Sequence, residues 1–214
     1  IEYCKQVEPK GIAEAFLLCK DFIGQHSVSL ILGDNVFYGN MRLQEVYQNF
    51  NEGALVFGYP VSDPHKFGIL EFDSSKRVIG IEEKPKNPKS RYAVPGLYLY
   101  DNQVVSIAEK LKPSLRGELE ITDVNIEYLK KQNLKVELLG RGIAWLDTGS
   151  SDSLLDAGLF VNSINKRQSY QIGCPEEVAL RQNFIDVEKY KILCGKMPDC
   201  DYKNYLVDLL GDIT

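Results

Sequence analysis

Two aspartates, Asp34 and Asp147, each stand at the end of a short apolar run. Asp34 follows Ser29-Leu-Ile-Leu-Gly33, and Asp147 follows Ala144-Trp-Leu146. Open α/β sheets bind ligands beyond the carboxyl ends of their strands. Mg²⁺ takes one or two carboxylates, and phosphate oxygens and water complete its coordination shell. A single aspartate in such a position more often begins a turn than binds a ligand. For the two aspartates together, both alternatives stay open: they share a Mg²⁺ ion, or each begins a turn.

A charged segment, Glu82-Glu83-Lys84-Pro85, ends another apolar run. Lys84 offers a compact positive charge for a phosphate group, and Glu83 accepts hydrogen bonds from hydroxyl groups. Neighbouring residues of an extended strand point to opposite faces. Both side chains therefore reach one ligand only if the chain bends near Pro85. The alternative is a solvated run of charges, which is the more common occurrence.

Weaker candidates lie at three other places. Gly11 precedes a predicted helix and allows a flat ligand to approach the backbone closely, although an ordinary helix start reads the same way. Gly96 interrupts a strand pattern, which can mark a bulge or a close ligand. Arg116 stands before a helix and is weak evidence alone. Tyr98 and Tyr100 share one face of a strand and are interpreted as core residues.

Hydrophobic periodicity predicts the elements that position these residues. Strands are predicted at residues 28–32, 54–59, 68–73, 77–82, 92–100, 135–139 and 143–146, with a turn at 33–35. Helices are predicted at residues 11–24, 41–50, 104–111, 121–131, 150–165, 175–181, 187–194 and 202–210. Nearly continuous apolar runs are typical of buried, parallel-type strands. We therefore expect an α/β domain over residues 1–172, with a mixed, mainly parallel sheet flanked by helices, and a helical segment over residues 173–214.

The composition disfavours several classes of function. The 214 residues include 25 Lys and Arg against 30 Asp and Glu, so no basic excess exists for binding nucleic acid. No apolar run approaches the roughly 18 residues of a membrane span. The only histidines, His26 and His65, disfavour a histidine-centred hydrolase. Five cysteines without CxxC spacing favour reduced thiols and a cytoplasmic location.

Several motifs follow one another along the chain. They are Gln6-x-x-Pro9-x-Gly11-Ile-Ala13, Leu30-Ile-Leu-Gly-Asp-Asn35 with Phe37-Tyr-Gly39, Asp63-Pro64 with Phe67-Gly68, Glu82-Glu-Lys-Pro85, Tyr92-Ala-Val-x-Gly-Leu-Tyr98, Arg116-Gly-Glu-Leu-Glu-Ile-Thr-Asp123, Ala144-Trp-Leu-Asp-Thr-Gly149 and Cys174-Pro-Glu-Glu177. In this order they resemble the glucose-1-phosphate thymidylyltransferases, or dTDP-glucose pyrophosphorylases, of the sugar nucleotidyltransferase family. The resemblance runs from about residue 6 to about residue 186.

This resemblance implies a Rossmann-like nucleotide-diphospho-sugar transferase fold and a Mg²⁺-dependent enzyme. Glucose 1-phosphate would attack the α-phosphorus of dTTP in line, giving dTDP-glucose and pyrophosphate without a covalent protein intermediate. The family is generally homotetrameric. Its product implies a role in deoxysugar synthesis, such as rhamnose for lipopolysaccharide O-antigen.

The resemblance also implies roles for individual residues. Asp34 and Asp147 would bind the metal, with Asp34 also beside the nucleotide, and both would count as catalytic together with Lys84. Lys84 would hold the sugar phosphate, and Glu83 the sugar hydroxyls. The remaining implied roles are thymine contacts at Gln6 and Gly11 with Pro9 shaping their pocket, sugar-pocket positions at Gly68, Val94 and Arg116, and a regulatory nucleotide site at Arg141 and Glu177.

The sequence departs from the family pattern in one large feature. The Gly-rich loop of the form G-x-G-T-R-L, which grips the triphosphate, is absent from the 214 residues and would precede Ile1. We therefore expect a fold that is incomplete at its N-terminus and a chain that is inactive alone. Phe67, Pro95 and Ile143 are milder departures, which affect rate or sugar fit. Two alternatives stay open: a non-catalytic sugar-nucleotide-binding or assembly protein, and a related nucleotidyltransferase with another base or sugar.

Overall fold

The computed structural model describes residues 1–213, with side chains for residues 1–211. The described chain forms two compact units, the first spanning residues 1–148 and the second beginning at Gly149. The sequence pattern had suggested a boundary between residues 172 and 173. The structure instead groups the long helix α6 (Ser151–Gln168) with the helices that follow it.

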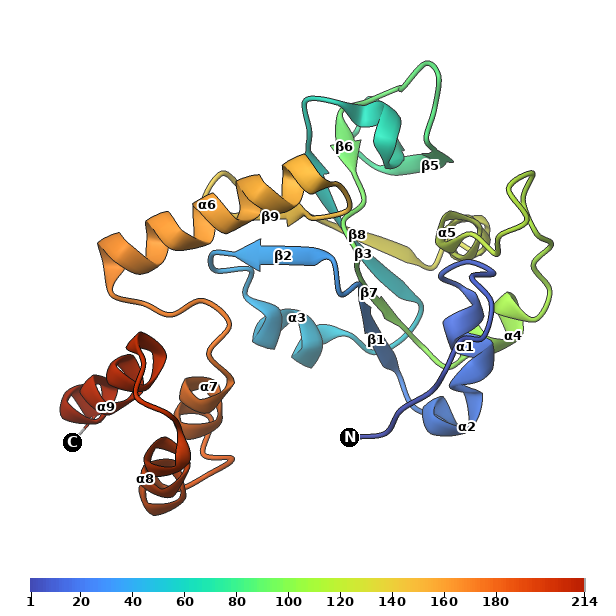
Figure 1. The fold of residues 1–214 in the computed structure, drawn as a ribbon. Coiled ribbons are helices and arrows are strands. Elements are labelled where there is room, and N and C mark those ends of the chain that lie inside the picture. Colours follow the sequence, from blue (N-terminus) through green and yellow to red (C-terminus); the bar gives the residue numbers. More distant parts are fainter. Residues whose placement is uncertain (214) are drawn as a thin grey trace. The chain divides into compact units, whose positions relative to one another are not determined.

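The first unit contains strands and short helices (Figure 1). Its strands are β1 (Val28–Ile31), β2 (Asn35–Tyr38), β3 (Ala54–Pro60), β4 (Gly68–Phe72), β5 (Val78–Glu83), β6 (Tyr92–Ala93), β7 (Leu97–Tyr100), β8 (Leu134–Leu138) and β9 (Ala144–Asp147). Its helices are α1 (Glu14–Leu18), α2 (Lys20–Ile23), α3 (Leu43–Asn49), the 3₁₀ turn η1 (Pro64–Lys66), α4 (Gln103–Ala108) and α5 (Ile121–Lys130).

A seven-stranded sheet forms the centre of this unit, in the order β1-β7-β3-β6-β4-β5, with β8 beside β3. The predicted α/β class and mixed sheet flanked by helices are confirmed, but the expectation of a mainly parallel sheet is wrong. Only β3 and β8 pair in parallel among the described strands, and the other neighbours are antiparallel. A continuous apolar run indicates that a strand is buried on both faces. It does not indicate whether the neighbouring strand runs parallel or antiparallel to it.

The two faces of β3 pack against different helices. Ala54 and Val56 join the core cluster that contains residues of α1, α2, α4 and α5. Leu55 and Phe57 point to the opposite face and join a cluster that includes partly buried residues of α3. Side chains alternate between the faces of a strand, so covering both faces with helices requires the continuous apolar sequence seen here.

A second, two-stranded sheet joins β2 and β9 (Figure 1). The pair is antiparallel, with Asn35 opposite Asp147 and Phe37 opposite Trp145. The sequence predicts only a turn at residues 33–35 and misses this strand. All four residues of β2 are half-buried, so they show no alternation of apolar and polar residues that would indicate a strand. This missed strand is the element that brings the two predicted aspartates together.

The predicted helix over residues 11–24 is shorter and interrupted. It consists of α1 and α2, which meet at Cys19, and Gly11 stays outside the helix with φ +101°. Gly11 cannot extend the helix because its backbone lies against Leu119: the Lys10 carbonyl accepts a hydrogen bond from the Leu119 N–H at 2.7 Å. A Cβ at Gly11 would stand 2.4 Å from the Leu119 carbonyl oxygen.

The second unit is helical, as predicted. Its helices are α6, α7 (Pro175–Arg181), α8 (Val187–Lys196) and α9 (Asp201–Ile213). Ser150 and Ser153 form a capping box that begins α6, and Tyr190 and Leu206 lie fully buried in the core of α7 to α9. No helix within residues 1–213 combines the length and hydrophobicity needed to cross a membrane.

Candidate active site

A cavity of about 230 Å³ in the first unit collects many of the predicted site residues. Its walls come from the ends of β1, β5 and β9, from β2 and β4, and from the first turns of α5. The predicted site residues among its lining are Asp34, Gly68, Glu83, Lys84, Val94 and Asp147. These six residues come from five separate segments of the sequence that converge on one space.

Asp34 and Asp147 are held together by the β2–β9 pair. The N–H and the hydroxyl of Thr148 both donate to the Asp34 carbonyl oxygen, each at 2.8 Å. The Asn35 amide nitrogen donates to the Asp34 carboxylate at 2.7 Å, and its oxygen accepts from Trp145 Nε1 at 2.7 Å. These bonds fix the position of one carboxylate and the strand that carries the other.

The donor set at this edge fits a hard divalent cation. Within the described residues no three His, Cys, Asp or Glu side chains are arranged to hold a metal. Mg²⁺ does not need three, because it binds through one or two carboxylates and completes its shell with substrate phosphates and water. Asp34 and Asp147 at one cavity provide these two oxygen donors.

Glu83 and Lys84 both line the cavity although they are neighbours in sequence. Lys84 adopts φ +44°, a left-handed conformation, and its N–H donates to the Phe67 carbonyl at 3.0 Å. This turn at the end of β5 breaks the alternation of an extended strand. The bend on which the sequence interpretation depended therefore exists, at the residue before Pro85.

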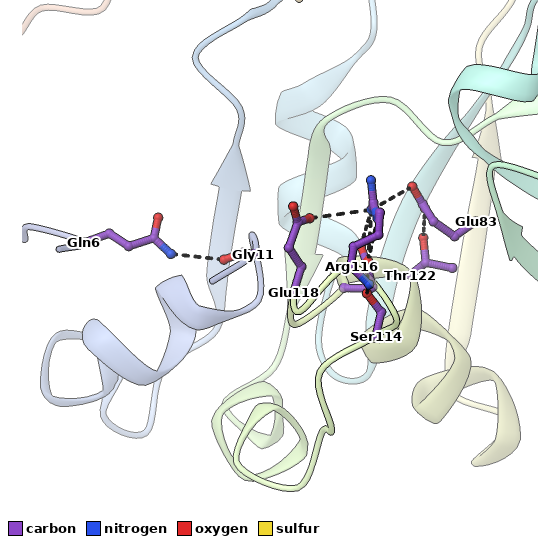
Figure 2. Close-up of polar contacts among 8 residues, drawn as sticks. Gln6, Gly11, Glu83, Ser114, Arg116, Glu118 and Thr122 are labelled. Carbon is purple, nitrogen blue, oxygen red and sulfur yellow. Dashed lines mark hydrogen bonds and ion pairs between the residues drawn. The ribbon is translucent and has the colours of Figure 1, made fainter. Parts of the chain in front are cut away.

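The Glu83 carboxylate is held by two residues that precede or begin α5 (Figure 2). The Thr122 hydroxyl donates to Glu83 Oε2 at 2.5 Å, and an Arg116 guanidinium nitrogen lies 3.8 Å from Oε1. Arg116 also binds Glu120 through two nitrogens, at 2.8 and 3.2 Å, and this pairing raises the pKa of Arg116. Arg116 is not among the lining residues of the cavity, so it reaches the site through Glu83.

Gly68 leaves open the space in front of this carboxylate. A Cβ at Gly68 would stand 3.0 Å from the Thr122 hydroxyl oxygen and 3.3 Å from Glu83 Oε2. The Gly68 carbonyl accepts a hydrogen bond from the Val94 N–H at 2.9 Å, which joins these two lining residues. The pairing keeps the backbone of both segments at the cavity wall.

The predicted thymine contacts lie outside this cavity. The Gln6 amide nitrogen donates to the Gly11 carbonyl at 3.2 Å (Figure 2). The same nitrogen donates to the Glu14 carboxylate at 2.6 Å. Gln6 and Pro9 are exposed, and the lining includes Ile12 but not Gln6, Pro9 or Gly11. The structure brings Gln6 and Gly11 together, and their contact with a base stays a prediction.

The two predicted regulatory residues belong to different units. Arg141 is exposed in the turn between β8 and β9. Glu177 lies in α7, where its carboxylate accepts a hydrogen bond from the Tyr205 hydroxyl at 2.5 Å and pairs with Arg181 at 2.7 Å. A shared site for Arg141 and Glu177 stays a prediction, because each unit is described separately.

The Tyr205–Glu177 bond predicts a pH response of the second unit. Burial, followed by the hydrogen bond to Glu177, raises the pKa of Tyr205 to about 12. The fold thus favours the neutral phenol, and this stabilisation is complete below the ordinary tyrosine pKa of about 10 and disappears as pH rises through 12. In an absorbance titration at 295 nm, Tyr205→Phe is expected to remove a transition near pH 12. Glu177→Gln should move that transition to lower pH, and an unchanged titration in both variants would contradict the assignment.

Sequence reasoning missed several residues of the cavity. Asn35, Thr122 and Trp145 occurred in the quoted motifs, but no local pattern indicates that Thr122 faces Glu83, 39 residues earlier. Tyr98 was interpreted as core alone, whereas it is 3% exposed and also lines the cavity. Burial and the charges of Glu83 and Asp34 raise the pKa of Tyr98, so its hydroxyl stays protonated.

A cavity lined by two carboxylates and a lysine suits the binding of a phosphorylated ligand. Comparison with known families agrees with this class of protein. The profile of the family described as Nucleotidyl transferase matches residues 1–164, and the chain belongs to this family. Glucose-1-phosphate thymidylyltransferase of Mycolicibacterium smegmatis is 49% identical over 98% of this chain and 73% of its own length. The enzyme of that name from Neisseria meningitidis serogroup A is 47% identical over 98% of this chain and 74% of its own length.

Solved structures show the same fold. A Bacillus anthracis protein assigned as a glucose-1-phosphate thymidylyltransferase, in complex with a sucrose, aligns with a TM-score of 0.65 and 46% identity. The alignment covers 72% of this chain and 62% of that one. A UDP-glucose pyrophosphorylase complexed with UDP-glucose aligns with a TM-score of 0.68 and 21% identity over 76% of this chain and 66% of that one. The nucleotidyltransferase-like fold predicted from the motifs is confirmed.

Proposed function

We propose that the chain carries the sugar-nucleotide site of a glucose-1-phosphate thymidylyltransferase, which transfers a thymidylyl group from dTTP to glucose 1-phosphate. The observation that carries the proposal is the single cavity that collects Asp34, Asp147, Glu83 and Lys84. The relatives named above, 47–49% identical over 98% of the chain, support this choice of base and sugar.

Each group in the cavity has a task in this reaction. Lys84 holds the phosphate of glucose 1-phosphate, and Glu83, held by Thr122 and Arg116, accepts hydrogen bonds from the sugar hydroxyls. Asp34 and Asp147 would hold Mg²⁺, which when bound would neutralise phosphate charge. Lys84 orients the phosphate of glucose 1-phosphate so that its oxygen attacks the α-phosphorus of dTTP as pyrophosphate leaves, a step that needs alignment more than covalent chemistry.

The remaining assignments complete the proposal. Gln6 and Gly11 contact thymine, with Pro9 shaping their pocket, and Arg141 and Glu177 contribute to a regulatory nucleotide site in a homotetramer. The enzyme works in the cytoplasm and supplies dTDP-glucose for deoxysugars such as rhamnose. Size-exclusion chromatography with light scattering tests the tetramer, and a mass corresponding to a monomer at micromolar concentration would count against it.

The proposed activity is tested by incubating the whole protein with Mg²⁺, dTTP and glucose 1-phosphate, and turnover by the 214 residues alone would contradict the expectation that they are inactive by themselves. Formation of dTDP-glucose and pyrophosphate is followed by chromatography, and binding of dTDP-glucose is measured separately by calorimetry. UTP, ATP and other sugar phosphates serve as competing substrates. If the whole protein binds dTDP-glucose without turnover, it is a sugar-nucleotide-binding protein. If it prefers another nucleoside triphosphate or another sugar phosphate, it is a different nucleotidyltransferase.

Thr122→Val is expected to raise the KM for glucose 1-phosphate about 3- to 10-fold with kcat changed less than about twofold. Valine keeps the shape of Thr122 and removes the hydroxyl that donates to Glu83. Ser106→Ala, which removes a surface hydroxyl on α4, is the matched control. Equal KM values in wild type and Thr122→Val would show that Glu83 does not depend on this bond.

A further inference from the structure

Asn125 is a buried polar residue of the cavity that none of the roles above uses. It lies on α5, it is 1% exposed, and it lines the cavity together with Thr122 and Tyr98. The Tyr100 hydroxyl donates to its side-chain oxygen at 2.6 Å. This bond engages the amide oxygen, and the amide nitrogen is the other polar atom of a side chain that lines the cavity.

Tyr100 holds this amide in one orientation. The Tyr100 side chain is completely buried, its ring stacks with Tyr98 and Tyr128 at centroid distances of 6.1 and 5.6 Å, and Phe16 packs edge-on at 5.3 Å. The hydroxyl therefore has little freedom to move. With the amide oxygen committed to Tyr100, the amide nitrogen is the group left to interact with the contents of the cavity.

An amide nitrogen donates hydrogen bonds, so one that lines a cavity can pair with an acceptor on the molecule that occupies it. The closest lining neighbours indicate which ligand. Thr122 stands one helical turn before Asn125 and donates to Glu83, the residue assigned to the sugar hydroxyls. A neutral amide suits a neutral hydroxyl, whereas the charge of a phosphate is met by Lys84 in the same cavity.

We propose that the Asn125 amide nitrogen donates a hydrogen bond to a hydroxyl oxygen of glucose 1-phosphate, which makes Asn125 a specificity-determining residue. This inference rests on the proposed function, because it names a contact within the same sugar site. Glu83 accepts a hydrogen bond from one sugar hydroxyl, and Asn125 donates a hydrogen bond to another. The cavity thereby distinguishes sugars by the positions of two hydroxyl groups.

The test compares two variants that differ only in the donor. Tyr100→Phe keeps Asn125, and the double variant Tyr100→Phe/Asn125→Leu removes both buried polar partners, which leaves neither group unsatisfied. Glucose 1-phosphate binding is followed by the fluorescence of Trp145, the single tryptophan, which lines the cavity. Tyr100→Phe removes the bond that orients the amide, so we expect it to bind glucose 1-phosphate more weakly than wild type. The double variant also lacks the donor, and we expect it to bind about 3- to 10-fold more weakly than wild type.

Deoxy analogues of glucose 1-phosphate identify the hydroxyl. In wild type, replacing the contacted hydroxyl by hydrogen should weaken binding about 3- to 10-fold, and in the double variant the same replacement should have no effect. The other deoxy positions should weaken binding equally in both proteins. If every deoxy analogue loses the same affinity in wild type and in the double variant, the inference is overturned.

A second variant guards against failure of the double variant to fold. Asn125→Asp preserves the acceptor for Tyr100 and lacks the amide donor, so it should weaken glucose 1-phosphate binding at least as much. Affinity equal to wild type in a folded Asn125→Asp protein would overturn the contact while leaving the proposed function intact. Absence of glucose 1-phosphate binding in wild type would instead overturn the proposed function itself.

Discussion

In the whole protein, replacement of either Asp34 or Asp147 by asparagine is expected to lower Mg²⁺-dependent formation of dTDP-glucose by at least about a hundredfold. Both carboxylates line one cavity, because Asp34 directly precedes β2 and Asp147 ends β9, the strand that pairs with β2. A bound metal stabilises charge on the transferred phosphoryl group by several kcal/mol, and each 1.36 kcal/mol corresponds to about tenfold in rate. Asparagine keeps the size of the side chain and removes the negative charge that binds the cation.

Two further measurements separate metal binding from folding. Mg²⁺-dependent binding of dTDP-glucose, measured by calorimetry, should weaken in both variants, while their thermal unfolding should stay close to that of wild type. Asp21→Asn, which changes an exposed aspartate on α2, is the matched control and should keep full activity. Wild-type turnover and wild-type Mg²⁺ dependence in Asp147→Asn would remove this residue from the metal site.

Gly11→Ala is expected to lower the free energy of unfolding of the first unit by about 2–4 kcal/mol. The residue has φ +101°, where an L side chain is strained, and its Cβ would stand 2.4 and 2.5 Å from the oxygen and nitrogen of the Leu119 backbone. Backbone atoms cannot rotate away as a side chain does. The segments must separate, which also strains the Lys10–Leu119 and Ala13–Leu119 backbone hydrogen bonds of 2.7 and 3.2 Å.

Urea unfolding followed by Trp145 fluorescence measures this effect, because the only tryptophan belongs to the first unit. Gly140→Ala is the control: a Cβ there has no neighbour within 4 Å, and its change should stay within about 0.5 kcal/mol. A weaker affinity for dTTP in Gly11→Ala would accompany the loss of stability if the segment carrying Gln6 contacts thymine. Equal unfolding midpoints for wild type and Gly11→Ala would show that the two segments separate without cost.

Local sequence patterns were sufficient for most of the elements and for the family. The apolar runs predicted β1 and β3 within about one residue, and the periodicity after Glu120 predicted α5 nearly to its last residue. These features depend on burial and on helix or strand period, which neighbouring residues encode. The ordered motifs likewise identified the family, and they named Asp34, Glu83, Lys84 and Asp147 as residues of one site.

The arrangement of the site depended on contacts between distant segments. Strand β2 has no local signal and exists because it pairs with β9, and the Asn35–Trp145 bond across that pair joins residues 110 positions apart. The antiparallel place of β7 between β1 and β3, and the bond from Thr122 to Glu83, are of the same kind. A residue's own neighbours determine whether it is buried and in what conformation, whereas its partner across the sheet is chosen by the packing of the whole unit.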